Sequence, residues 1–173
     1  MGQGESAWNN NSYTTVHPFR AFVGGKGSIC PTRRLILVDI ENYCGKGVLG
    51  ANDVCKAKSS ITEDLSLTDK DLVIVGTSHG ANCLTCGVEW RGPRQVLRKG
   101  HNGADIALIE SVQDYRLETF AAVIIVSGDG IFVNVAKVAK AYSKPVVVAA
   151  RKESLSRRLA LAASVVRYVR LAA

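Results

Sequence analysis

The sequence predicts an α/β fold, a single domain with a mainly parallel central sheet and helices on both faces. Runs of β-branched apolar residues, of which AVIIV at 122–126 is the clearest, have the composition of strands buried on both faces of a parallel sheet. These runs alternate with segments in which apolar residues recur every three or four positions, as on a helix that packs one face down. The chain of 173 residues is long enough for one well-buried domain and too short for two ordinary ones. This alternation predicts right-handed crossovers between parallel strands.

Residues 1–31 are rich in Gly, Asn, Ser and Thr and show neither period, so we expect a flexible leader before a domain that spans 32–173. Its run VGGKGS is not a phosphate-binding loop, because Gly27 separates the Lys from the Ser. The first residues lack the basic start and apolar core of a signal peptide, and no apolar run approaches the ~20 residues of a membrane span. We therefore expect a cytoplasmic protein with no membrane partner and with free thiols.

The domain opens with a strand and a helix. RRLILVDI at 33–40 is apolar in its middle and reaches an acid near its end, which indicates a buried strand. After a glycine-rich turn, Asn52 can cap a helix over 52–65. Four apolar residues share one side of that helix: Val54, Ala57, Ile61 and Leu65.

The middle of the chain is less regular. Strands are expected at 72–75 and 95–97, and residues 76–93 show no period, so we expect irregular structure there. A helix fits 104–117, where the apolar residues on one arc are Leu108, Ile109, Val112 and Tyr115. Asp105 falls within this arc, and a carboxylate that faces the interior is costly unless something pairs with it.

The last third of the domain repeats the strand-helix pattern. The strand at 122–126 leads through Ser-Gly-Asp into a helix over 133–142, whose expected packing face contains Val135, Val138, Ala139 and Tyr142. A fifth strand is expected at 145–149, a helix at 155–163 and a short edge strand at 165–171.

The formal charge of +7 is concentrated in two segments. Residues 144–173 hold seven Lys and Arg against one Glu, and residues 91–101 hold four basic residues and no acid. Such segments favour a polyanion, with nucleic acid ahead of membrane, although a solvated surface explains the charge about as well. The basic side chains that we expect to contact the polyanion are Arg91, Arg94, Arg98, Lys99, Arg151, Lys152, Arg157 and Arg158.

Three acids are expected at one edge of the sheet. Asp39 and Asp129 each follow an apolar strand, and Asp105 begins the helix that follows another. Each acid has a structural explanation as a helix cap or a favourable charge at a helix start. Together, at ~5 Å and an effective dielectric of ~20, each pair would repel by roughly 3 kcal/mol, and a divalent cation removes that cost. Oxygen ligands without His or Cys favour Mg²⁺ or Mn²⁺, and such an ion beside a polyanion surface favours phosphodiester hydrolysis.

Four segments, in this order, resemble the NYN domain family of PIN-like metal-dependent ribonucleases: VDIENY, KGHNGADIALIESV, VIIVSGDGIF and VVVAARKESLSRRLALAA. The likeness covers about residues 33–171. It implies a PIN-like (Rossmannoid) fold, one or two Mg²⁺ or Mn²⁺ ions and RNA as the substrate of an endoribonuclease. The positions that match the family's site are Asp39, Asn42, Asp105, Ser127 and Asp129, of which the three Asp residues would hold the metal.

Two positions depart from the pattern that the resemblance implies. Many members have further acids where this chain has Ser111 and Ile131. The site would then hold a single ion weakly, or Glu110 or Glu41 would supply another ligand. The alternative is a non-catalytic RNA-binding or scaffold module with a degenerate site. The sequence also leaves open whether the protein forms a homodimer.

Other patterns are weaker. Cys83 and Cys86 have the spacing of zinc ligands, and Cys44 and Cys55 could complete a set of four, although those two are far apart in sequence. A Cys nucleophile paired with His79 or His101 has no supporting motif. Trp90, between basic residues, suits either base stacking or core packing.

Overall fold

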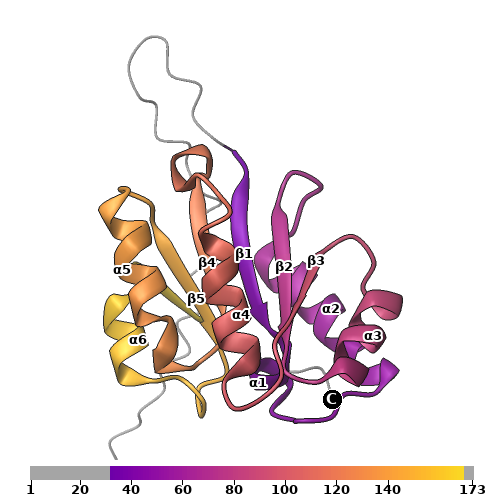
Figure 1. Ribbon diagram of the computed structural model, residues 1–173. Coiled ribbons are helices and arrows are strands. Elements are labelled where there is room, and N and C mark those ends of the chain that lie inside the picture. The colour runs from indigo at the N-terminus through magenta and orange to yellow at the C-terminus, as the bar shows by residue number, and fades with distance from the viewer. Residues whose placement is uncertain (1–31, 170–173) are drawn as a thin grey trace, which may run out of the picture. The chain divides into compact units, whose positions relative to one another are not determined.

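The computed structural model describes residues 32–169, so the leader expected at 1–31 lies outside the described residues. Six strands form one sheet in the order β3-β2-β1-β4-β5-β6, and every neighbouring pair is parallel (Figure 1). The strands are β1 (Arg34–Asp39), β2 (Leu72–Thr77), β3 (Arg94–Leu97), β4 (Ala122–Val126), β5 (Val146–Ala150) and β6 (Val165–Tyr168). The predicted α/β class and parallel sheet are confirmed.

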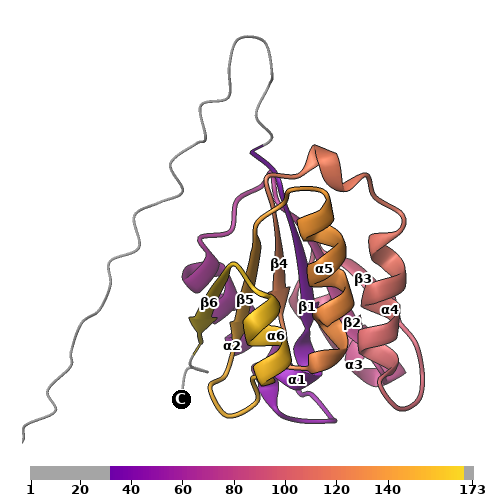
Figure 2. The same ribbon diagram turned by 90° about the vertical axis from the view of Figure 1, so that its left-hand side faces the viewer.

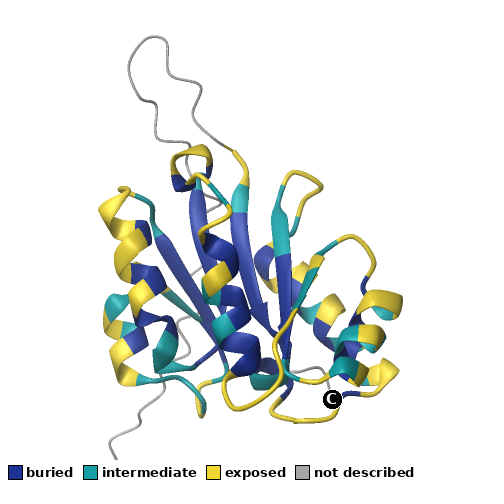
Figure 3. Cartoon of the chain, in the orientation of Figure 1, coloured by how far each residue is buried: buried dark blue, intermediate teal, exposed yellow. Residues whose placement is uncertain are grey.

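Helices cover both faces of this sheet (Figures 1 and 2). They are α1 (Ile40–Cys44), α2 (Ala51–Leu65), α3 (Gly80–Glu89), α4 (Gly103–Val112), α5 (Val133–Ala141) and α6 (Arg157–Ala162), with 3₁₀ turns η1 (Leu117–Thr119) and η2 (Gly130–Phe132). Alternate residues of β1 enter two separate cores, since Leu35 and Leu37 pack with α4, α5 and α6, whereas Ile36 and Val38 pack with α1, α2 and α3. The central strands are therefore buried on both faces (Figure 3). Within residues 32–169, no helix has the length and apolar character needed to cross a bilayer.

The carboxyl ends of all the strands lie at one edge of the sheet, at the bottom of Figure 1. Strand β1 pairs with β2 on one side and with β4 on the other, so the direction of strand order changes beside it. In open α/β sheets, this reversal opens a crevice at the carboxyl edge where ligands bind. The residues that follow β1, β2 and β4 are therefore candidates for a ligand-binding site.

Helix α3 lies in the segment 76–93, for which irregular structure was predicted, so that prediction was wrong. The residues of α3 that are buried are Asn82 and Cys86, and these two do not form an apolar stripe. The Asn82 amide donates to Glu41 Oε1 at 2.6 Å and to the Gly47 carbonyl at 2.9 Å, and its oxygen accepts from Leu49 N at 3.0 Å. A satisfied polar side chain replaces the apolar residue that would have revealed the helix.

Other helices also have ends that differ from the predicted ones, including α6, which begins at Arg157 rather than at 155. Helix α2 is preceded by Gly50 as its N-cap, before the predicted cap Asn52, because the Asp53 carboxylate accepts from Gly50 N at 3.1 Å. Helix α4 ends at Val112 rather than near 117, which lies in η1. These shifts are a few residues long and leave the order of elements unchanged.

The packing face of α5 differs from the predicted one. Its core contacts come from Val135, Ala136 and Ala139, which are buried. Val138 and Tyr142, both predicted on this face, are 46% and 47% exposed. The small residues Ala136 and Ala139 face the core, and the two larger side chains lie on the solvent side.

Gly103, the first residue of α4, should not tolerate a side chain. A Cβ built there would lie 1.8 Å from the carbonyl oxygen of Arg98, so the backbone would have to move. Gly103→Ala should therefore destabilise the protein by about 3 kcal/mol, at the upper end of overpacking costs. Gly87→Ala is the matched control, because Gly87 lies at an exposed position of α3 and a Cβ there would meet nothing within 4 Å. This substitution should stabilise the protein by ~0.5–1 kcal/mol. Urea denaturation of both variants measures the difference, and equal stabilities would contradict it.

Candidate active site

The Asp39 side chain lies at the carboxyl end of β1, where it joins β1 to β4. The register pairs Val38 with Val126, which brings the following residues Asp39 and Ser127 side by side. Asp39 Oδ1 accepts from Asn42 N at 3.1 Å and caps α1, and Oδ2 accepts from Ser127 Oγ at 3.2 Å. Only 4% of Asp39 is exposed, so these bonds hold an acid that is almost removed from water.

A cavity of about 200 Å³ opens beside Asp39 and gathers four carboxyl groups. Its lining residues are Asp39, Glu41, Asn42, Ser78, Asn102, Gly103, Ala104, Asp105 and Asp129. The three predicted acids and the predicted Asn42 are thus brought together from α1, α4 and the ends of β1 and β4. Predicted Ser127 is buried directly behind Asp39. We refer to this cavity as the acidic cavity.

Asp39 and Asp105 form a closely coupled pair. Burial, followed by repulsion from Asp105, raises the pKa of Asp39 to about 8. Burial also raises the pKa of Asp105, and the charges of Asp129 and Glu41 add to the increase. A pKa near 8 favours the protonated form of Asp39 at neutral pH, in which its carboxyl can donate a hydrogen bond to Asp105. Among the described residues, Asp105 Oδ1 is a buried oxygen without a hydrogen-bond partner.

Glu41 is held rigidly and remains ionised. Its carboxylate accepts hydrogen bonds from Ser78 N at 2.9 Å, from Asn82 Nδ2 at 2.6 Å and from Ser78 Oγ. Burial acts to raise the pKa of Glu41, but these hydrogen bonds outweigh it and the pKa is lowered. Ser78 and Asn82 were missed as site residues because their segment was predicted to be irregular. The signal that could have found them is the polar run TSHGAN directly after a buried strand.

The carboxylate of Asp129 is turned toward its own backbone. Its Oδ1 accepts from Ile131 N at 2.9 Å and caps η2, while Asp129 N donates to Ser127 Oγ at 3.2 Å. In this arrangement, no three His, Cys, Asp or Glu side chains among residues 32–169 already form a set that could hold a metal ion. A cation held jointly by Asp39, Asp105 and Asp129 would require these side chains to come closer together than they lie here.

The oxygen chemistry of the acidic cavity suits a hard divalent cation. Its acids supply only oxygen, which Mg²⁺ and Mn²⁺ prefer, and the unpartnered Asp105 Oδ1 is a ligand atom with no other use in the described structure. Asp39 and Asp105 have raised pKa values chiefly because they are buried and also because other carboxyl groups lie near them. A bound cation would relieve that repulsion.

Asn42 holds the turn that carries Asp129. Its Oδ1 accepts from Gly128 N at 3.1 Å, across 86 residues of sequence. The Asn42 carbonyl accepts from Arg151 Nη2 at 3.1 Å, and the guanidinium lies over Gly45, where a Cβ would come within 2.8 Å of Nη2. Gly45 has φ 66°, so the tight end of α1 needs glycine for both reasons. Arg151, predicted to bind RNA, is therefore used inside the protein.

The remaining predicted RNA-binding residues fall into two groups. Arg94 pairs with Asp114 at 2.8 Å, and Arg98 pairs with Glu110 at 2.5 Å. Glu110 is thus an exposed ion-pair partner outside the acidic cavity, and its suggested role as an extra ligand was wrong. The other cations have no ion-pair partner within the described part of the chain: Arg91, Lys99, Lys152, Arg157 and Arg158.

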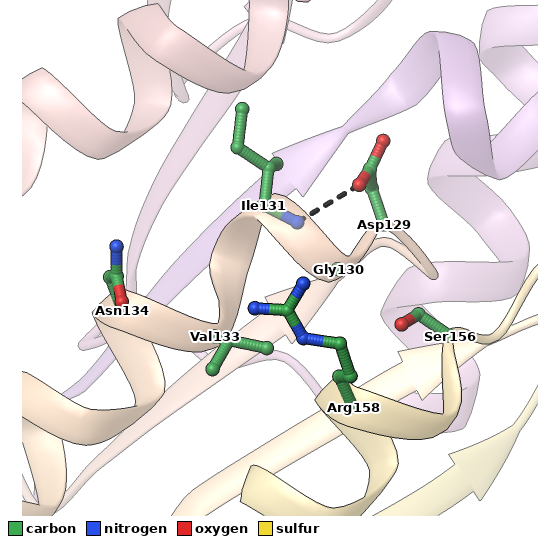
Figure 4. A pocket seen from close by; sticks show the side chains of 7 residues that line it. All are labelled: Asp129, Gly130, Ile131, Val133, Asn134, Ser156 and Arg158. Atoms are coloured by element: carbon green, nitrogen blue, oxygen red, sulfur yellow. Dashed lines mark hydrogen bonds between the residues drawn. The ribbon is translucent and has the colours of Figure 1, made fainter.

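The two positions that depart from the resembled pattern face different surroundings. Ser111 is buried on α4 and donates to the Leu108 carbonyl at 2.7 Å, so it is not part of the acidic cavity. Ile131 is partly buried against the core and lines a neighbouring cavity (Figure 4). Neither residue supplies an oxygen ligand from its side chain to the acidic cavity.

The cysteine and aromatic alternatives lose their support. The described cysteines are free, and they do not belong to any group of three potential metal ligands within residues 32–169. Cys55 instead contacts Glu89 on the surface, whereas Cys44 and Cys86 are buried. Trp90 is only 4% exposed and packs in the core with α2, so stacking on a base is excluded by its burial.

Comparison with known proteins identifies a family and a fold. The model of the NYN domain matches residues 69–170 of the chain. A solved structure of a protein of unknown function from Vibrio parahaemolyticus is similar, with a TM-score of 0.57 and 17% identity over 82% of this chain and 95% of that one. At this identity the likeness concerns the fold. No protein with a curated description matches the chain.

Proposed function

Because this chain belongs to the NYN domain family, we propose that it is a metal-dependent endoribonuclease that hydrolyses RNA phosphodiester bonds at the acidic cavity. The observation that carries the proposal is the convergence of Asp39, Glu41, Asp105 and Asp129 in one cavity at the carboxyl edge of a parallel sheet. Acids whose pKa values are raised by burial and by neighbouring carboxylates are costly to maintain, which favours a functional origin for the cluster.

In this proposal Asp39, Asp105 and Asp129 hold Mg²⁺ or Mn²⁺. The bound ion would activate water and neutralise charge on the phosphate. The chain's own residues prepare the site: Asp39 carries a proton that cation binding has to release, and Glu41 keeps a fixed negative charge. Asn42 and Ser127 hold the Gly128–Asp129 turn and would orient the water or the scissile phosphate.

RNA would reach the cavity along basic side chains. Those without an ion pair in the described structure are available to phosphates at once: Arg91, Lys99, Lys152, Arg157 and Arg158. Arg94 and Arg98 would first have to break exposed ion pairs, which costs little free energy because such pairs contribute little stability. We propose that the enzyme acts in the cytoplasm, in keeping with its free thiols. Light scattering would decide between a monomer and the homodimer that the sequence permits.

Asp129→Asn tests the proposal directly. Asn can still accept from Ile131 N and cap η2, so the fold should persist while one anionic ligand is lost. We expect cleavage of single-stranded RNA by the parent with Mn²⁺ or Mg²⁺, no cleavage with EDTA, and at least a hundredfold slower cleavage by the variant. Asp53→Asn, at the start of α2, is a control that should cleave like the parent. A variant at Asp129 with the parental rate would refute this assignment.

The second candidate is an RNA-binding or scaffold module without catalysis. It is favoured by the orientation of Asp129 toward its cap and by Ile131 and Ser111, which supply no ligand to the cavity. It predicts salt-sensitive RNA binding with no metal-dependent turnover. Turnover above that of a protein with Asp39, Asp105 and Asp129 all changed to Asn would exclude it.

A further inference from the structure

A second cavity lies against the acidic cavity and shares one wall with it. Its volume is about 520 Å³, within the range of roughly 300–1,000 Å³ that is usual for ligand sites. The residues that line it are Asp129, Gly130, Ile131, Val133, Asn134, Ser156 and Arg158 (Figure 4). Asp129 belongs to both cavities, so a ligand that passes Asp129 leaves one and enters the other.

The two cavities differ in electrostatic character. The acidic cavity is lined by four carboxyl groups and no cation, whereas the second is lined by Asp129 and the guanidinium of Arg158. In Figure 4 the Arg158 side chain extends from α6 toward Gly130 and the start of α5. An anion excluded from the first cavity would find its counter-charge in the second.

Three polar side chains in the second cavity have no partner in the described structure. Within residues 32–169, neither a hydrogen bond nor an ion pair engages the side chain of Asn134, Ser156 or Arg158. This sets Arg158 apart from Arg94, Arg98 and Arg151, each of which already has a partner. Free hydrogen-bond donors that line the same cavity can bind a phosphate and its sugar.

The wall between the cavities is fixed by the backbone. Ser156 N donates to the Gly128 carbonyl at 2.8 Å, which ties the segment before α6 to the turn that carries Asp129. A Cβ at Gly130 would lie 2.9 Å from Ser156 Oγ, and one at Gly128 would lie 2.2 Å from the Ser154 carbonyl oxygen. The backbone just before Arg158 is therefore held at a defined place relative to the acids, while its exposed side chain is free to turn toward a ligand.

We infer that the second cavity is a nucleotide subsite, in which Arg158 binds the RNA phosphate next to the one that is cleaved. Ser156 and Asn134 supply hydrogen bonds to the same nucleotide, and Ile131 and Val133 give its sugar or base an apolar floor. The inference rests on the proposed function for the meaning of the cleaved phosphate. Binding of RNA at Arg158 does not itself require cleavage.

Binding to a short fluorescein-labelled oligouridylate, measured by anisotropy in EDTA, tests the subsite without turnover. Arg158→Gln should weaken binding about tenfold and reduce the slope of log K against log salt by ~0.7, the value for one phosphate on a single strand. Arg158→Lys should recover the salt slope and only part of the affinity, because lysine keeps the charge but loses the planar fork. Arg116→Gln is the matched control, since Arg116 is an exposed arginine beside η1 that lines neither cavity and is not among the residues proposed to bind RNA.

The outcomes separate the subsite from the nuclease proposal. Parental affinity in Arg158→Gln, or an equal loss in Arg116→Gln, would overturn the subsite, whatever Asp129→Asn does to cleavage. A selective loss in Arg158→Gln would support it even if no preparation cleaved RNA. With an active enzyme, Arg158→Gln should raise KM about tenfold and leave kcat nearly unchanged, because the contact is made in both bound and transition states.

Discussion

Asp105→Asn should slow RNA cleavage at least a hundredfold and, at the same time, make the metal-free protein more stable. Asp105 is 7% exposed, its pKa is raised by burial and by the charges of Asp129 and Glu41, and its Oδ1 lacks a hydrogen-bond partner in the described structure. The amide has nearly the same shape and no charge, so it removes the repulsion together with the ligand. A gain of about 1 kcal/mol would raise the melting temperature by about 3 °C.

Slower cleavage together with a higher melting temperature of the metal-free protein would exclude a purely structural role for Asp105. Substitution of a purely structural acid at a helix start would lower stability and leave cleavage by the folded protein unchanged, because only its favourable interaction with the helix dipole would be removed. Asp114→Asn, which changes an exposed acid just beyond α4, should alter neither readout by more than a small amount. If Asp105→Asn melts below the parent without metal and cleaves at the parental rate, Asp105 is not a metal ligand.

Cation binding should strengthen about tenfold for each unit that the pH rises, up to about pH 8. The pKa of Asp39 is raised to about 8, so below that pH the ion has to displace a proton, and above it the carboxylate is already free. For folding, the sign follows from the same shift. The folded protein holds a proton that the unfolded chain releases near pH 4, so this stabilisation is complete below about pH 4 and is lost as the pH rises through about 8.

Melting curves between about pH 6 and pH 9, with and without Mg²⁺, would measure both effects. The metal-free protein should lose stability toward alkaline pH, and Mg²⁺ at a hundredfold excess over its Kd should restore ~2.7 kcal/mol. Asp39→Asn should flatten the pH dependence of stability and that of metal binding, because Asn does not titrate. The fold should persist, because Asn can still accept from Asn42 N and donate to Asp105. A metal response with the same pH dependence in parent and variant would show that Asp39 is not the titrating group.

The sheet and its acids were predictable because strand composition and strand-end position are local properties. Each buried strand is a run of β-branched residues, and parallel strands bring their carboxyl ends to one edge, so Asp39, Asp105 and Asp129 could be expected to meet. Helix α3 could not be expected, because its inward residue Asn82 is polar and its partners come from residues 41–49.

The roles of the arginines depend on contacts that local sequence does not contain. Arg151 reaches the Asn42 carbonyl across 109 residues, and Arg94 and Arg98 find their acids on or just after α4. Composition alone does not distinguish these arginines from Arg158, whose side chain has no hydrogen-bond or ion-pair partner in the described structure. A basic cluster in a sequence therefore predicts the kind of partner better than it predicts which side chains bind it.

The central place of β1 has a consequence for how the protein forms during synthesis. Strand β1 is made first among the described strands, but one of its two neighbours, β4, follows about 80 residues later in the chain. Until β4 leaves the ribosome, the apolar β1 has an open edge that can pair with other chains. All the strand pairs are parallel and need long crossovers, so we expect slow folding that depends on protection by chaperones. The nascent chain would also lack the complete acidic cavity until Asp129 is made, so under the proposed function a partly made chain would not cleave RNA.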